Sequence, residues 1–338
     1  MMLNSRVLSI QSHVVHGYVG NKCAVLPLNR LGMDVDAINT VEFSNHTGYP
    51  NFTGKVLDGT GLLQLIDGLE TNGLLNYTHL LTGYIGSLSL LETIAGVVDR
   101  LRKINPNLIY VCDPVQGDDG RLYCRPELPH AFRTSILPIA SVITPNQYEA
   151  ELLAEMPITS EEDALAACAI LHSKGPHTVV ITSLNLDPSW VIIVASTTIE
   201  QKQKHTGQLR GTTADGNTTR TTENNSYTQY KLRVPRVKGY FTGTGDLFTA
   251  LLLGWMHRHP ENLKLALEYA VAGLQTVLLD TVQYASGHGG GAEERERNAN
   301  VCAVRELRLI QNQDAMAAPK SILYEALPCE EPWPLETC

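Results

Sequence analysis

The chain has 338 residues, with 26 Lys and Arg against 35 Asp and Glu, so its formal net charge is −9. This acidic balance excludes the basic surface that nucleic-acid-binding proteins need. An apolar fraction of 43% excludes wholesale disorder. The seven cysteines include no C-x-x-C pair, and no apolar run approaches the roughly 18 residues of a membrane span. We therefore expect a cytoplasmic protein that binds neither nucleic acid nor membranes.

Short β-type runs alternate with helical patterns along most of the chain. The β-type runs cover residues 7–10, 35–41, 78–81, 108–112, 141–144, 178–182 and 191–195. Helical patterns cover residues 21–31, a stretch ending near 104, residues 148–154 and residues 247–256. Strands separated by helices of this length predict βαβ units. The fold class that they indicate is α/β with a largely parallel sheet.

Two polar stretches interrupt this alternation. Residues 200–230 are rich in Thr, Gln, Asn, Lys and Gly, which is typical of a surface insertion, and residues 287–300 read as a flexible loop between two C-terminal helices. Either stretch could instead dock a partner. Cutting the chain at 200 leaves too few strands for a second sheet. We expect one domain over 1–313, carrying the insertion and the loop, followed by a C-terminal tail at 314–338.

Residues 241–246 read Phe-Thr-Gly-Thr-Gly-Asp and lead directly into a helical pattern. Gly243 and Gly245 allow the backbone to turn with its N–H groups exposed, and the start of the helix adds a positive dipole end. Together these features predict an anion site. Asp246 is either an acid favoured by the helix dipole or a catalytic base. As a base it would accept a proton from a hydroxyl that attacks a phosphoryl group.

Further acidic and amide side chains follow two of the predicted strands, where ligands of open α/β sheets bind. Asp113 and Asp118 suit Mg²⁺, which takes one or two carboxylates together with water and substrate phosphates; alternatively they cap an Asp-Pro turn. Asn146 and Glu149 fit a helix capping box. In the functional alternative, Asn146 and Glu149 reach the same metal–phosphate cluster through water.

Near the N-terminus, Gln11-Ser12-His13 and the segment 44–49 (Ser-Asn-His-Thr-Gly-Tyr) offer hydroxyls, amides and aromatic rings. This set suits a small polar aromatic ligand. Taken singly, His13 and His46 are better explained as hydrogen-bonded structural histidines. No His-Glu-x-x-His, G-x-S-x-G or G-x-x-x-x-G-K-[S/T] motif occurs, so the motifs that mark zincins, serine hydrolases and P-loop enzymes are missing.

As a set, these segments resemble the pyridoxal kinase family, within the ribokinase-like superfamily of vitamin kinases. In chain order they read VLSIQSHV (7–14), GYVGN (17–21), FSNHTGY (43–49), LTGY (81–84), VCDPV (111–115), ITPNQ (143–147) and GTGD (243–246). The last three segments are shared across vitamin kinases of the superfamily, whereas QSH and SNHTGY point to the pyridoxal branch. The resemblance implies a three-layer sandwich, a mostly parallel sheet flanked by helices, and a homodimer.

The resemblance also implies roles for single residues. Asp246 matches the catalytic base, and Gly243 and Gly245 match the anion hole. The pyridoxal contacts that it implies are Ser12, Thr47, Tyr84 and Asp246. The nucleotide contacts are Asp118, Tyr123, Asn146, Glu149, Thr182, Ser183 and Thr244, and the metal surroundings are Asp113, Asp118, Thr144 and Glu149. The implied cofactors are ATP, Mg²⁺ or another divalent cation, and a monovalent cation such as K⁺.

The expected reaction is transfer of phosphate from ATP to the 5′-hydroxymethyl group of pyridoxal, and also of pyridoxine and pyridoxamine, giving the 5′-phosphate and ADP. Two alternatives stay open: a kinase for the hydroxymethyl-pyrimidine precursor of thiamine, and a non-catalytic binder of pyridoxal. The sequence departs from the family pattern in the insertion at 200–230, in His16, where a basic or aromatic residue is common, and in a short loop at 117–122.

Overall fold

The structure is a computed structural model of the chain. It describes residues 5–199, 227–290, 298–319, 321–322 and 324–334. Within these residues a ten-stranded sheet has the order β12-β11-β10-β9-β8-β5-β4-β1-β2-β3. Its strands are β1 (Arg6–Val14), β2 (Asp34–Phe43), β3 (Gly54–Val56), β4 (His79–Thr82), β5 (Ile109–Cys112), β8 (Val142–Ile143), β9 (Thr178–Leu184), β10 (Trp190–Thr198), β11 (Tyr227–Pro235) and β12 (Leu327–Pro328).

The middle of the sheet is parallel and its two edges are antiparallel. Strands β2, β1, β4, β5, β8 and β9 pair in parallel, whereas β3 at one edge and β10, β11 and β12 at the other pair antiparallel. Strand β1 lies between β2 and β4. The chain therefore runs from β1 through β2 to β3 in one direction along the sheet, and from β3 it returns past β1 to β4 in the other. Such a switch point opens a crevice beyond the carboxyl ends of the strands.

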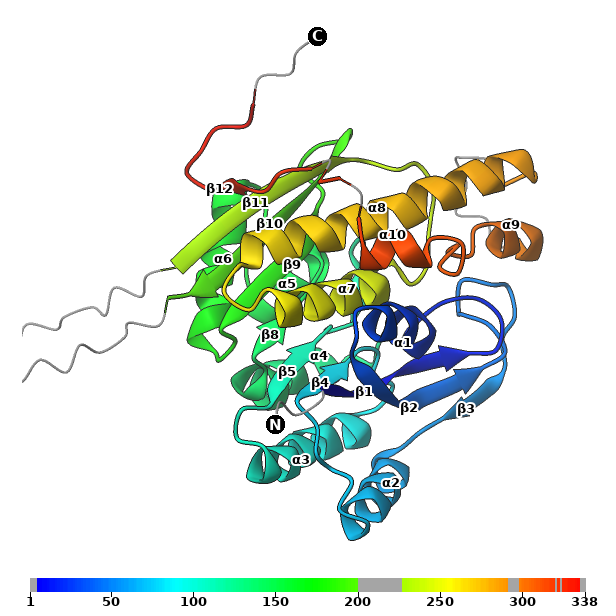
Figure 1. Ribbon diagram of the computed structural model, residues 1–338, viewed down its shortest axis with the longest axis vertical. Coiled ribbons are helices and arrows are strands. Elements are labelled where there is room, and N and C mark those ends of the chain that lie inside the picture. Colours follow the sequence, from blue (N-terminus) through cyan, green and yellow to red (C-terminus); the bar gives the residue numbers. More distant parts are fainter. Residues whose placement is uncertain (1–4, 200–226, 291–297, 320, 323, 335–338) are drawn as a thin grey trace, which may run out of the picture.

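Helices cover both faces of this sheet (Figure 1). One layer holds α1 (Asn21–Arg30), α7 (Thr244–Arg258), α8 (Leu263–Gly287) and α10 (Gln313–Ala317), which pack on one another. The other layer holds α2 (Gly59–Thr71), α3 (Leu88–Ile104), α4 (Leu128–Ala131), α5 (Gln147–Ala154) and α6 (Glu161–Ser173), with the π-helical turn η1 (Phe132–Ile136) and the 3₁₀ turn η2 (Leu137–Ile139). The remaining elements are α9 (Ala299–Val304) and the small hairpin of β6 (Gly117–Asp118) and β7 (Arg121–Leu122).

Alternate residues of the central strands enter different cores. On β1, Val7 packs in the cluster beside α1, whereas Leu8 and Ile10 pack in the cluster beside α2 and α3. All three are fully buried. A strand buried on both faces reads as a continuous apolar run, which is why the sequence pattern located these strands. The predicted α/β three-layer sandwich is confirmed.

The predicted insertion at 200–230 is wrong at its C-terminal end. Residues 227–230 belong to β11, where Tyr227 pairs with Thr198 and Tyr230 with Ala195. Residues 200–226 lie outside the described part of the chain, as do 291–297 of the predicted loop between α8 and α9. The strand start was missed because Tyr227–Tyr230 are only half-buried and carry polar side chains, so no apolar alternation marks them.

The last part of the chain packs on the domain. Met316 of α10 is fully buried, and β12 pairs with β11 at the edge of the sheet. The Ala326 N–H donates to the Glu268 carboxylate of α8 at 2.9 Å. Among the described residues, α8 is the one helix long and apolar enough to cross a membrane by composition. Its contacts with α7 and α10 are those of a core helix.

Candidate active site

Helix α7 begins at an open N-terminus. Gly243 precedes it with a φ of +86°, and no side chain of the described residues caps the helix. A Cβ on Gly243 would lie 2.3 Å from the carbonyl oxygen of Tyr18. Only glycine therefore fits this left-handed position. The first N–H groups of α7 are left for a ligand, as an anion site requires.

Asp246 lies in the first turn of α7 and faces the loop after β1. Its carboxylate accepts a hydrogen bond from the Gly20 N–H. Burial raises the pKa of Asp246, and this hydrogen bond opposes the shift. A carboxylate whose pKa lies above its ordinary value accepts a proton more readily than an exposed one. The arrangement therefore joins a base to an anion site.

Asp113 follows β5 and lies against the same helix. Its side chain is buried, and a Cβ on Gly245 would lie 3.6 Å from its Oδ2. It accepts a hydrogen bond from the Thr249 hydroxyl, and Thr249 in turn contacts the Thr144 hydroxyl at 2.8 Å. Burial, together with the Glu149 and Asp246 carboxylates, raises the pKa of Asp113 well above its ordinary value. Thr249 was not predicted as a site residue.

Asn146 and Glu149 form the predicted capping box at the start of α5. The Asn146 Oδ1 accepts from the Glu149 N–H at 2.9 Å, and the Glu149 Oε2 accepts from the Asn146 N–H at 2.9 Å. The other Glu149 oxygen accepts from the N–H groups of Gln116 and Gly117. Burial raises the pKa of Glu149 to about 7. Glu149 thus holds the turn that follows Asp113.

A cavity of about 530 Å³ opens beside the N-terminus of α7. This volume is in the usual range of small-molecule sites. Predicted nucleotide residues that line it are Asp118, Asn146, Thr182, Ser183 and Thr244. Its apolar walls were not predicted: Val191, Ile193, Val234, Val237, Phe241, Phe248, Val271, Leu274 and Leu278. Tyr123 lies outside the lining and is half-exposed, and its N–H donates to the Gln116 carbonyl at 2.7 Å.

The residues around Asp113 fit a cation. Within the described chain no group of three or more His, Cys, Asp and Glu side chains has the geometry of a metal cage, but Mg²⁺ needs only one or two carboxylates when phosphates and water complete its shell. The Glu149 carboxylate adds to the burial that raises the pKa of Asp113, and the Asp118 carboxylate adds to the burial that raises the pKa of Glu149. Neither Asp113 nor Glu149 has a Lys or Arg partner among the described ion pairs. The buried Gln116 Oε1 in the same turn has no hydrogen-bond partner among the residues that the structure describes. The site therefore offers carboxyl groups whose ionisation a bound cation would favour, and a spare oxygen ligand.

Besides Asp246, the three other predicted pyridoxal contacts come from different segments at the carboxyl ends of β1, β2 and β4. Ser12 is buried on β1, and its Oγ would lie 2.4 Å from a Cβ on Gly20. Thr47 is exposed and precedes Gly48, whose added Cβ would lie 3.5 Å from the Thr242 Oγ1 beside α7. Tyr84 follows β4 and is half-buried. The fold thus places the loop that carries Thr47 next to the anion site.

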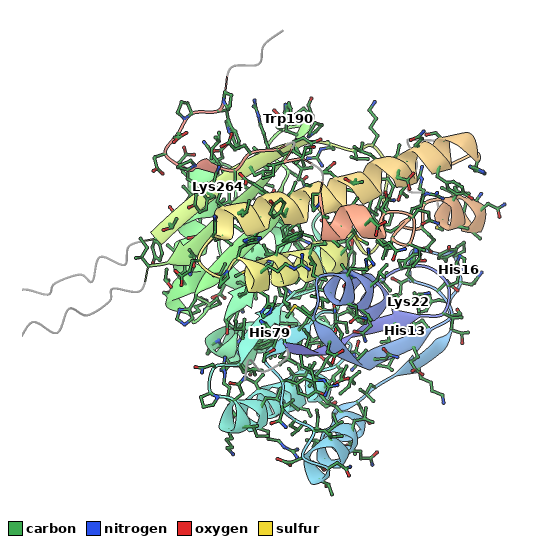
Figure 2. The ribbon with its side chains drawn as sticks, viewed as in Figure 1. His13, His16, Lys22, His79, Trp190 and Lys264 are labelled. Carbon is green, nitrogen blue, oxygen red and sulfur yellow. The ribbon has the colours of Figure 1, made fainter. Side chains whose placement is uncertain are left out.

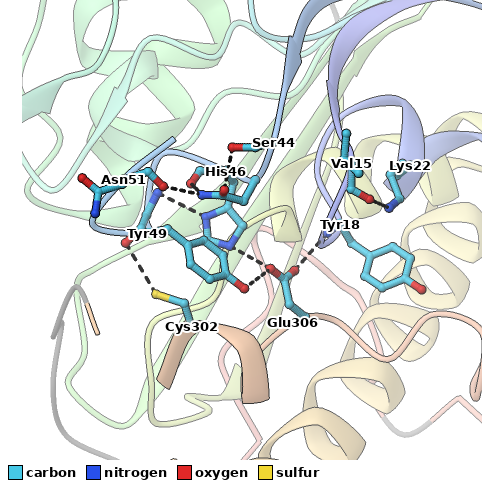
Figure 3. Close-up of polar contacts among 11 residues, drawn as sticks. Val15, Tyr18, Lys22, Ser44, His46, Tyr49, Asn51, Cys302 and Glu306 are labelled. Atoms are coloured by element: carbon cyan, nitrogen blue, oxygen red, sulfur yellow. Dashed lines mark hydrogen bonds and ion pairs between the residues drawn. The ribbon is translucent and has the colours of Figure 1, made fainter. Parts of the chain in front are cut away.

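The two histidines near this edge differ in their contacts. His46 is buried; its Nδ1 accepts from the Gly48 N–H at 3.1 Å, and its Nε2 lies 3.2 Å from the Glu306 carboxylate (Figure 3). The prediction of a hydrogen-bonded structural histidine is confirmed for His46. His13 lies on the same side of the molecule as Lys22 (Figure 2), and burial and that ammonium group lower its pKa. Glu306 belongs to no motif, so the sequence offered no signal for it.

Comparisons with known proteins agree with this geometry. The chain matches the family model of phosphomethylpyrimidine kinase over residues 79–291. The pyridoxal kinase of Arabidopsis thaliana is 50% identical over 315 residues, covering 93% of this chain and 92% of that protein. The human pyridoxal kinase is 39% identical over 326 residues, covering 94% and 97%. The structure of Leishmania donovani pyridoxal kinase in complex with ADP and pyridoxamine has a TM-score of 0.80 at 35% identity, covering 96% of this chain and 100% of that one. The chain belongs to the pyridoxal kinase family.

Proposed function

We propose that this protein transfers the γ-phosphoryl group of ATP to the 5′-hydroxymethyl oxygen of pyridoxal, pyridoxine and pyridoxamine. One observation carries the proposal: the buried Asp246 carboxylate lies in the first turn of an uncapped helix, beside Asp113 and a cavity of nucleotide size. The pyridoxal kinase relatives, and the neighbouring structures with ADP and vitamers, support the choice of substrates.

In the proposed reaction, the apolar walls of the cavity hold the nucleotide base and the N–H groups at the start of α7 hold its phosphates. Asp246 accepts the proton of the vitamer hydroxyl as its oxygen forms a bond to the γ-phosphorus. The bond from that phosphorus to the β,γ-bridging oxygen breaks, and ADP leaves. The anion site stabilises charge on the transferred group, so catalysis depends on position and electrostatics.

A divalent cation completes the proposed site. The Asp113 carboxylate would hold it together with Asp118, which follows in the same turn, and the Thr144 hydroxyl, which contacts the Asp113 partner Thr249. Glu149 fixes the turn between Asp113 and Asp118. Bound there, the ion would neutralise the β- and γ-phosphates during transfer. We extend the proposal to Mg²⁺ as the divalent ion and to K⁺ as a monovalent ion.

The matched family model favours one rival, a kinase for hydroxymethyl-pyrimidine. A coupled assay of ADP release distinguishes pyridoxal kinase activity from hydroxymethyl-pyrimidine kinase activity when the two substrates are compared at equal concentrations. We expect a higher kcat/KM for pyridoxal, loss of turnover with EDTA, its recovery with Mg²⁺, and stimulation by K⁺. A higher kcat/KM for the pyrimidine would favour the rival. Absence of ADP release with every vitamer would leave a non-catalytic binder.

We also propose a cytoplasmic homodimer that binds no nucleic acid or membrane. Apolar side chains are exposed around the β3 edge of the sheet: Val56 is 56% and Phe52 is 47% exposed. Such side chains suit contact with a second copy. Light scattering after size exclusion should give twice the chain mass of 37.1 kDa, and Val56→Lys should shift the mass towards that of one chain.

A further inference from the structure

Glu306 lies two residues beyond α9, and its side chain contacts the loops that follow β1 and β2. Its side chain is only 11% exposed. The carboxylate accepts hydrogen bonds from the Tyr18 N–H and the Tyr49 hydroxyl, each at 2.9 Å (Figure 3). The His46 Nε2 lies 3.2 Å from the same carboxylate. One carboxylate thus contacts three donor groups from two loops.

The direction of these hydrogen bonds follows from their surroundings. The His46 Nδ1 accepts from the Gly48 N–H, so the ring proton lies on Nε2 and points to Glu306. Burial and the Glu306 carboxylate raise the pKa of Tyr49, which keeps its phenol a donor. Burial of Glu306 opposes its ionisation, but the contacts with His46, Tyr49 and Tyr18 hold its pKa below the ordinary value. Glu306 is therefore an ionised acceptor.

The two loops that Glu306 joins are those next to the proposed chemistry. His46 and Tyr49 flank Thr47, the proposed pyridoxal contact. Tyr18 lies against the anion site, because its carbonyl oxygen would be 2.3 Å from a Cβ on Gly243. Gly17, with a φ of +90°, leaves room for the carboxylate, since a Cβ there would lie 2.2 Å from the Glu306 Oε1. None of the three donor residues lines the nucleotide cavity.

We propose that Glu306 is a positioning residue for the vitamer: it fixes the loop bearing Thr47 against the loop at Tyr18, and so sets the vitamer's place relative to Gly243. This inference rests on the proposed function. The Cys302 thiol of α9 also contacts the Gly48 carbonyl oxygen, with its Sγ at 3.5 Å, so the C-terminal segment touches this loop at two points.

Glu306→Gln tests the proposal with little change of shape. Gln has one acceptor oxygen, so at least one of the three donors loses its partner. We expect kcat/KM for pyridoxal to fall on the order of 10–100-fold, the effect of one lost hydrogen bond to a buried charge. KM for ATP should stay within about twofold, because the cavity is not touched. Glu325→Gln is the matched control, an exposed carboxylate paired with Lys264, and should change neither parameter.

Tyr49→Phe removes one contact and keeps the ring, so it carries the test if Glu306→Gln does not fold. Tyr49→Phe should also raise KM for pyridoxal. The double variant should lose less than the product of the two single losses, because both substitutions act on the same group of contacts around Glu306. Lower thermal stability with an unchanged KM for pyridoxal would overturn the inference, as would equal effects on pyridoxal and ATP. Failure of the parent protein to phosphorylate pyridoxal would instead overturn the proposed function.

Discussion

Thr249 links Asp113 at the end of β5 to helix α7. Its hydroxyl donates to the Asp113 carboxylate. Because that proton is used, the Thr144 hydroxyl is the donor and the Thr249 oxygen the acceptor in the 2.8 Å hydrogen bond between them. Three segments that are far apart in sequence are thereby joined below the proposed cation site. Thr249 lies three residues after Asp246, one turn further along the same helix.

Thr249→Val should weaken the proposed cation site. The substitution keeps the shape of the side chain but leaves Asp113 without its neutral donor, so its already raised pKa should rise further. We expect a several-fold higher Mg²⁺ concentration at half-maximal rate and a loss of about 1–3 kcal/mol in the free energy of unfolding. A Mg²⁺ titration of the initial rate checks the first effect. Thr276→Val on α8 is the control; an Mg²⁺ dependence equal to that of the parent would contradict the assignment.

Asp246→Asn separates a base from a helix-start acid. If Asp246 accepts the proton, kcat should fall on the order of 10²–10⁴-fold while the KM values change little. The measurement is single-turnover phosphorylation by a variant whose thermal melt matches the parent. Asp163→Asn is the matched control, because Asp163 also lies in a first helical turn but far from the site in the fold. A rate within a few-fold of the parent would refute the role of Asp246.

Residues 201–225 should be replaceable by a short Gly/Ser link. Thr198 and Tyr227 are paired neighbours on antiparallel strands, so a tight turn can close the hairpin without moving either strand. Shortening a loop changes its closure free energy by only about 0.6 kcal/mol per halving of its length. Thermal unfolding and kcat should match the parent. A folded variant without activity would indicate that the segment reaches the active site.

His79 should make the protein less stable in acid. Burial, with a smaller contribution from His257, lowers its pKa to about 4. Between pH 6.5 and 4 the unfolded chain binds a proton that the folded chain does not, so the free energy of unfolding falls with pH, by up to about 3 kcal/mol. Urea unfolding at several pH values should show a shallower fall for His79→Gln, whereas His130→Gln at an exposed position should keep the parental slope. Equal slopes for all three proteins would contradict the assignment.

The sequence predicted what depends on local pattern. The buried parallel strands read as apolar runs, and Asn146 and Glu149 were three positions apart at the start of a helical pattern, so the capping box could be foreseen. The start of β11 could not, because Tyr227–Tyr230 lie near a sheet edge where polar side chains are tolerated. Thr249 and the apolar cavity walls read as ordinary core residues of helices and strands; only tertiary packing turns them towards a site.

The Glu306 contacts also affect the order in which parts of the fold can form during synthesis. Glu306 reaches Tyr18 across 288 positions of sequence and Tyr49 across 257. During synthesis the N-terminal loops leave the ribosome first, and their acceptor follows only when most of the chain has emerged. Contacts of such separation form late and slow folding. A nascent chain stopped at residue 298 would already contain Asp246 and the whole parallel sheet, yet Tyr49 and the Tyr18 N–H would still lack the carboxylate that joins them.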